Sequence, residues 1–158
     1  MLTRRLQTDK SERTGATLVE TAVVLPVFLI FVWAIIEFGH AFMVTNLLTA
    51  AAKRAAREGV ADEVTTAQVV ARANAIVGSA ISLDDVTVLV KDASIFDDPA
   101  ADISGIDYST LPNVELNDLE PRQLFVVYIE VPYSSVCIMP PRWVTGVTMR
   151  GMSAQRHE

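Results

Sequence analysis

An uncharged apolar run near the N-terminus constrains this chain more than any other feature. Residues 21–36 have the sequence TAVVLPVFLIFVWAII, without a single charged side chain. As a helix with a rise of 1.5 Å per residue, residues 16–38 would extend about 34 Å, which exceeds the roughly 30 Å hydrocarbon core of a bilayer. The run therefore predicts a transmembrane helix over residues 16–42, followed by a separate domain over residues 43–158.

The charges that flank this run predict its orientation. Residues 1–15 contain four basic side chains, Arg4, Arg5, Lys10 and Arg13, against two acidic ones. A basic flank favours the cytoplasmic side of a membrane, so we expect residues 1–15 to be a basic cytoplasmic leader. The apolar run is too long for a secretory signal and no clear Ala-x-Ala site follows it. We therefore expect a single-pass anchor in the cell (inner) membrane, uncleaved or cut on its cytoplasmic side, with an extracytoplasmic C-terminal domain.

One acidic residue, Glu20, stands about one turn inside the apolar stretch. A carboxylate at the centre of a bilayer costs about 2.5–3.5 kcal/mol, and less near the interface. Two interpretations are open: Glu20 snorkels to the interface, or it pairs with a positive group in an assembled state. If the chain were cut after Gly15, the new α-amine on Ala16 of a neighbouring subunit would supply that group.

The helix is expected to bend once and then to continue beyond the membrane. Pro26 removes a backbone donor and predicts a kink, at a cost of about 3 kcal/mol in a soluble helix and less in a membrane helix. Residues 46–60, with the sequence NLLTAAAKRAAREGV, form a strong helix-forming segment. Its small residues share one face, on which another element such as a sheet could pack closely: Ala51, Ala52, Ala55, Ala56 and Gly59.

Three short motifs in this region occur in order and resemble TadE-like proteins, the pilin-like (pseudopilin) components of Tad/Flp tight-adherence pilus systems. The first motif is a basic residue, a glycine and then a glutamate five residues later, followed by Leu-Pro: Arg13, Gly15, Glu20 and Leu25-Pro26. The second is Ile36-Glu37-Phe38-Gly39, and the third is Ala56-Arg57-Glu58-Gly59. The resemblance covers roughly residues 13–60.

This resemblance implies a fold, a function and partners. It implies a pilin-like domain behind the helix, cleavage between Gly15 and Ala16 by a prepilin peptidase, and a pairing role for Glu20. The implied partners are membrane lipid, other Tad/Flp pilin-like subunits and inner-membrane assembly proteins. The implied activity is pilus assembly for adhesion or secretion through helix packing. An anchored extracytoplasmic domain that binds or senses a ligand, without a filament role, is the alternative.

The remainder of the chain predicts an α+β domain. Thr65 or Thr66 is expected to cap a second helix of about four turns, whose apolar stripe runs from Val69 to Ile81. Three strands are expected over residues 86–90, 124–131 and 144–154, with Pro140-Pro141 in the turn before the third. Residues 124–131 are apolar on both faces, which is typical of a central strand. We expect a small antiparallel sheet with the long helix over one face.

Composition excludes several function classes. Residues 61–158 contain fourteen acidic and six basic side chains, which argues against nucleic-acid binding. Asp97, Asp98, Asp102 and Asp107 lie in an acidic loop over residues 93–122, but their spacing lacks the EF-hand pattern, and we expect a solvated loop without metal. The sequence contains no common catalytic motif and only one cysteine, Cys137. We therefore expect no enzymatic activity and no cofactor.

Overall fold

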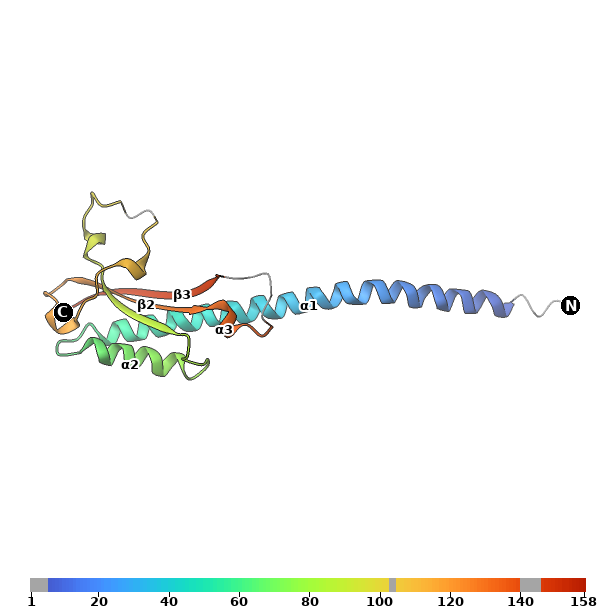
Figure 1. The fold of residues 1–158 in the computed structure, drawn as a ribbon, viewed down its shortest axis with the longest axis horizontal. Coiled ribbons are helices and arrows are strands. Elements are labelled where there is room, and N and C mark those ends of the chain that lie inside the picture. The colour runs from blue at the N-terminus through green and yellow to red at the C-terminus, as the bar shows by residue number, and fades with distance from the viewer. Residues whose placement is uncertain (1–5, 103–104, 140–145) are drawn as a thin grey trace. The chain divides into compact units, whose positions relative to one another are not determined.

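The computed structural model describes residues 6–102, 105–139 and 146–158 of the chain, and side chains from Gly15 onward (Figure 1). The described chain divides into two compact units, residues 1–39 and 40–158. The helix α1, Leu6–Glu58, belongs to both: it forms the described part of the first unit, and its last turns enter the core of the second. The prediction of a long apolar N-terminal helix is confirmed.

The second helix, α2, spans Thr66–Val77 and begins at the predicted cap. The Thr65 backbone N–H donates to Gln68 Oε1 (2.9 Å), and the Gln68 N–H donates to Thr65 Oγ1 (3.3 Å). This reciprocal capping box satisfies two of the free N–H groups at the helix start. The helix ends about one turn earlier than the apolar stripe predicts, because the chain turns at Gly78. Ile81 nevertheless packs against the core from the following turn.

Three strands form an antiparallel sheet in the order β1-β2-β3, with β1 at Thr87–Asp92, β2 at Leu124–Pro132 and β3 at Thr148–Arg156. The predicted central position of β2 is confirmed. A short helix, α3 (Tyr133–Val136), lies between β2 and β3. The third strand begins and ends later than predicted. Pro140-Pro141 and the start of the predicted strand at residues 144–145 lie outside the described residues.

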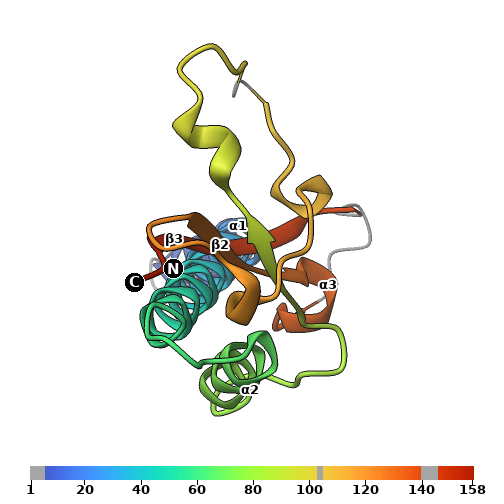
Figure 2. The same cartoon turned by 90° about the vertical axis from the view of Figure 1, so that its left-hand side faces the viewer.

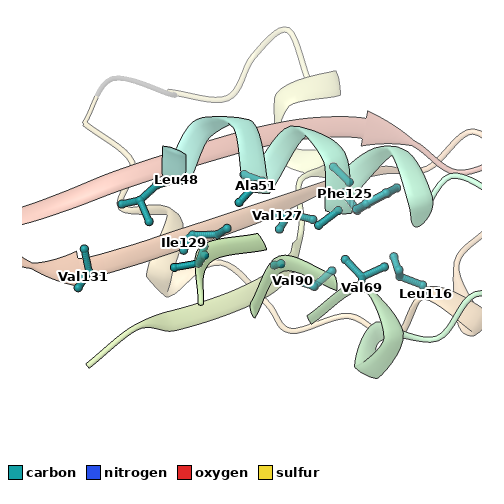
Figure 3. Close-up of a cluster of buried hydrophobic side chains, with 14 of the residues drawn as sticks. Leu48, Ala51, Val69, Val90, Leu116, Phe125, Val127, Ile129 and Val131 are labelled. Atoms are coloured by element: carbon teal, nitrogen blue, oxygen red, sulfur yellow. The ribbon is translucent and has the colours of Figure 1, made fainter. Parts of the chain in front are cut away.

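The main core lies between one face of the sheet and the two helices. Alternate side chains of β2 point into it, because successive residues of a strand face opposite ways: Phe125, Val127, Ile129 and Val131. Figure 3 shows them facing Leu48 and Ala51 of α1 and Val69 of α2. Figure 2 shows α2 and the C-terminal turns of α1 on one side of the sheet and the chain that follows β1 (yellow) on the other. Farther along the chain, Val114, Leu116 and Leu119 return to the core on the helix side. The architecture is α+β, as predicted.

Residues 93–122 are more structured than the expected solvated loop. They contain three 3₁₀ turns, η1 (Ser94–Asp97), η2 (Tyr108–Thr110) and η3 (Leu116–Asp118). Apolar residues of this segment form a second cluster around Val126 on the outer face of the sheet: Ala93, Phe96, Ile106, Tyr108 and Leu111. These residues are spread among polar ones, so that no periodic pattern marks them in the sequence.

Gly151 of β3 permits the close approach of α1 to the sheet. A Cβ atom built at Gly151 would collide with the backbone of Leu48 and Thr49 and would lie 2.7 Å from Leu48 Cβ. These backbone atoms cannot move aside to relieve the contact, whereas the end of a flexible side chain could. A glycine is therefore required where the strand crosses the helix.

The substitution Gly151→Ala should destabilise the full-length protein in detergent by about 1–3 kcal/mol, the usual cost of overpacking a core. Gly39→Ala is the matched control, because a Cβ at Gly39 meets nothing within 4 Å and alanine favours a helix. Chemical unfolding monitored by fluorescence measures both. Equal stability of the Gly151→Ala variant and the wild type would contradict this packing.

Candidate assembly interface

The apolar part of α1 exposes most of its side chains. The helix is long and apolar enough to cross a membrane, and no residue of its most apolar part is buried. Most large apolar side chains of this part are at least half exposed, among them Leu18, Val23, Phe31 and Ile35, whereas Trp33 and Ala34 are partly buried. A helix that is apolar all round requires a non-aqueous environment, either lipid or other apolar helices.

Gly15 and Ala16 both lie within α1 and are exposed. A Cβ at Gly15 would meet nothing within 4 Å, so packing in the chain does not require a glycine there. The peptide bond between the two residues is therefore exposed to solvent, although it lies within a helix.

Glu20 lies on the exposed surface of α1, one turn after Ala16. Among the side chains that the structure describes, it forms no ion pair. The neighbouring Thr21 hydroxyl donates to the Thr17 carbonyl (2.8 Å), so this polar group is satisfied within the helix. Glu20 is the only charged residue between residues 16 and 36. Because it is charged, Glu20 requires a partner when it leaves water.

Pro26 lies inside α1, and the helix continues on both sides of it. Its missing N–H leaves the Ala22 carbonyl without its usual donor within the helix. The predicted kink stays a prediction.

The small-residue face of α1 lies inside the second unit. Ala51, Ala52, Ala55 and Ala56 have no exposed surface. A Cβ at Gly59 would lie 2.9 Å from Leu116 Cδ1 and 3.0 Å from Val69 Cγ2. The chain's own sheet, α2 and η3 therefore occupy this face, and the surface available to another subunit lies earlier on the helix.

Three acidic residues of the 93–122 segment form hydrogen bonds within the domain. Asp97 forms two hydrogen bonds with Arg156 (2.6 and 3.0 Å), which hold the pKa of its carboxyl below the usual range. Asp98 accepts from the Ala100 N–H, and Asp107 accepts from the Ser109 N–H, which lowers the pKa of Asp107. Within residues 6–102, 105–139 and 146–158, no three His, Cys, Asp or Glu side chains are grouped in a manner suited to a metal ion.

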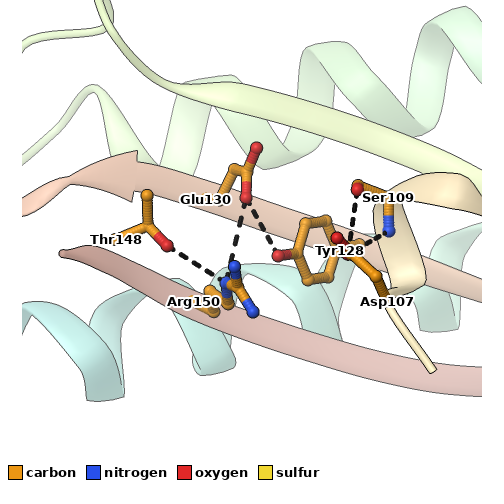
Figure 4. A network of polar contacts seen from close by, with 6 residues as sticks. All are labelled: Asp107, Ser109, Tyr128, Glu130, Thr148 and Arg150. Carbon is orange, nitrogen blue, oxygen red and sulfur yellow. Dashed lines mark hydrogen bonds and ion pairs between the residues drawn. The ribbon is translucent and has the colours of Figure 1, made fainter. Parts of the chain in front are cut away.

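A polar network on the outer face of the sheet could not be read from the sequence. The Tyr128 hydroxyl donates to Glu130 (2.9 Å), which lies 3.9 Å from Arg150 on the adjacent strand (Figure 4). The Tyr128 ring stacks on Tyr108, with the ring centroids 6.1 Å apart. Burial, and secondly the hydrogen bond to the Glu130 carboxylate, raise the pKa of Tyr128 to about 12. The network thus ties the 93–122 segment to both β2 and β3.

Comparison with known families gives a match that lies within the long helix α1. The family model for TadE-like proteins matches residues 15–57, which confirms the resemblance over the apolar and buried parts of α1. No curated protein and no solved structure matches the chain. The family match relates the chain to components of the Tad pilus system, which are structural rather than catalytic. The chain after residue 57 lies outside the matched segment.

Stability should fall more steeply above pH 10 in the wild type than in Tyr128→Phe. An unfolded tyrosine loses its proton near pH 10, whereas folded Tyr128 keeps it until about pH 12. The folded state therefore binds more protons across this window. The stability that the neutral phenol contributes is present below pH 10 and is lost as the pH rises, up to about 2–3 kcal/mol. Urea unfolding between pH 8 and 11.5 measures the difference, and parallel curves for the two proteins would contradict it.

Proposed function

We propose that this chain, whose residues 15–57 match the TadE-like family, is a pseudopilin-like subunit of a Tad/Flp pilus apparatus. It crosses the inner membrane once, with its N-terminus in the cytoplasm and residues 43–158 outside. It acts through packing of α1 with other pilin-like helices and not through catalysis. A prepilin peptidase cuts the chain between Gly15 and Ala16 before assembly.

The observation that carries the proposal is a largely exposed apolar helix that bears one charge, Glu20, five residues after Gly15. Side chains from Leu18 to Ile36 lie outside any core of this chain. Exposed apolar surface costs about 25 cal/mol per Å², so a helix of this length is stable only when lipid or neighbouring helices cover it. Both coverings fit a subunit that passes from a membrane into an assembly.

Glu20 supplies the specificity that apolar packing lacks. Apolar helix surfaces are covered almost equally well by lipid and by other helices, so they do not select a register. A carboxylate in this environment is stable only when it is paired. Cleavage after Gly15 creates an α-amine one turn before Glu20, so a neighbouring helix displaced by about 6 Å along its axis brings its amine level with this carboxylate. The carboxylate of one subunit then neutralises the amine of its neighbour and sets the register.

An anchored binding or sensing domain would make no use of this arrangement. A monomeric anchor requires neither cleavage at Gly15 nor a partner for Glu20, because the carboxylate can snorkel to the interface. Substitution of Glu20 therefore separates the two functions.

The variant Glu20→Gln keeps the side-chain shape and removes the charge. It should insert into membranes at the wild-type level, because a charge that opposes insertion is lost. Pilus assembly should fall at least tenfold, since one partner of a buried ion pair costs about 3–5 kcal/mol when it is removed. Glu20→Asp, which keeps the charge, is the control and should assemble far better. Immunoblots of membrane and sheared-pilus fractions measure both quantities, and normal assembly of Glu20→Gln would exclude the pairing role.

A further inference from the structure

We propose that the last turns of α1 dock into an acidic pocket of a second copy of this chain. Three exposed cations, Lys53, Arg54 and Arg57, form the basic face of the helix. The pocket opens beside Asp62 and Glu63, so one copy supplies the face and its neighbour supplies the pocket. The contact extends the proposed function and rests on it for one point only, that copies of α1 pack side by side.

The basic face is one exposed stripe of the helix. Residues 53 and 57 are four positions apart and residues 54 and 57 are three apart, so their side chains lie together on the helix surface. All three are exposed, and none forms an ion pair among the residues that the structure describes. The neighbouring Glu58 pairs instead with Arg72 on α2 (3.3 Å). The described chain therefore leaves this concentration of positive charge without a partner.

An acidic pocket lies just after the end of the same helix. It has a volume of about 520 Å³, and three acidic residues line it, Asp62, Glu63 and Glu158. No lysine or arginine is among its lining residues. Within the described ranges, none of the three acidic side chains forms an ion pair. Acidic groups gathered around a hollow attract a cation.

His157 indicates that the pocket also takes a hydrogen-bond donor. This residue lines the pocket and is only 7% exposed. Neither of its ring nitrogens has a hydrogen-bond partner in the described chain. Buried polar groups are normally paired, and a neutral imidazole has one nitrogen that accepts a hydrogen bond. A cation that carries N–H groups would satisfy both the carboxylates and this nitrogen.

The cation that fits is a guanidinium and not a metal ion. Among the described residues, no three His, Cys, Asp or Glu side chains are grouped closely enough to hold one metal ion. A guanidinium is larger and has five N–H donors, so it can bind acceptors that lie apart. Arg54 and Arg57 carry this group, and neither lines the pocket of its own chain. A second copy therefore has to supply it.

Charge complementarity favours a second copy as the partner. Residues 61–158 contain fourteen acidic and six basic side chains, so the domain of one copy attracts the basic face of another. The face and the pocket both belong to residues 40–158. Each copy carries one of each, so the contact can repeat from copy to copy as a heterologous interface, which suits a growing assembly.

Directed cross-linking between two full-length copies in membranes tests the contact. Cys137→Ser removes the native thiol from both copies. One copy then carries Ala50→Cys, about one turn before the basic face, and the other carries Ala61→Cys, next to the pocket. Both positions are exposed. A flexible bismaleimide should join the two copies. The yield should fall roughly threefold between 0.1 and 1 M salt, because salt screens exposed charges.

Exchange of the charges identifies the residues in contact. Arg57→Glu in the first copy, or Glu63→Lys in the second, should lower the yield roughly fivefold, since like charges then face each other. Both changes together should restore the yield, because the attraction returns with its direction reversed. Glu115→Lys in the second copy is the matched control, an identical charge change at an exposed residue outside the pocket, and should leave the yield unchanged. Failure of the paired exchange to restore the link would overturn the contact.

A third cross-link separates the possible failures. Val24→Cys in both copies lies on the exposed apolar part of α1 and reports the packing of the helices. A link at residue 24 without a link between residues 50 and 61 would overturn the charged contact alone. Absence of both links would overturn the side-by-side packing of copies, and the charged contact with it.

Discussion

The close packing of α1 on the sheet is the interaction on which the domain depends. Four alanines on one face of the helix and Gly151 on the crossing strand remove the side-chain bulk that normally separates a helix from a sheet. The approach is close enough for the backbone of Leu48 and Thr49 to exclude even a methyl group at Gly151. The helix therefore has one rotational setting against the sheet, and this setting determines which residues face outward.

The two parts of the helix consequently lie in different environments. Before Val44 its apolar side chains are large and exposed, which suits lipid or a helix bundle. After Val44 its inward side chains are mostly small and fully buried, which suits a tightly packed core. The family match covers both parts and ends at residue 57, where the helix ends.

Local patterns predicted those features that depend on neighbouring residues. Four features have a sequence pattern of their own, either a spacing of apolar or small residues or a capping residue. They are the uncharged run, the small-residue face, the Thr65 cap and the apolar β2 strand. The end of α2, the start of β3 and the apolar contacts of Phe96 and Tyr108 depend on tertiary packing instead. The Tyr128–Glu130–Arg150 network depends on strand register, which places Glu130 opposite Arg150. Residues of the candidate site were predicted through spacing: Gly15 and Glu20 are exposed positions that no packing in the chain explains.

The proposed pairing role of Glu20 requires a free α-amine at Ala16. The most direct measurement is the intact mass of the chain recovered from assembled pilus material, compared with the chain in the membrane pool. We predict that the assembled chain lacks residues 1–15 and begins at Ala16. A full-length chain in the assembled material would contradict the account, because the amine that Glu20 is proposed to neutralise would not exist.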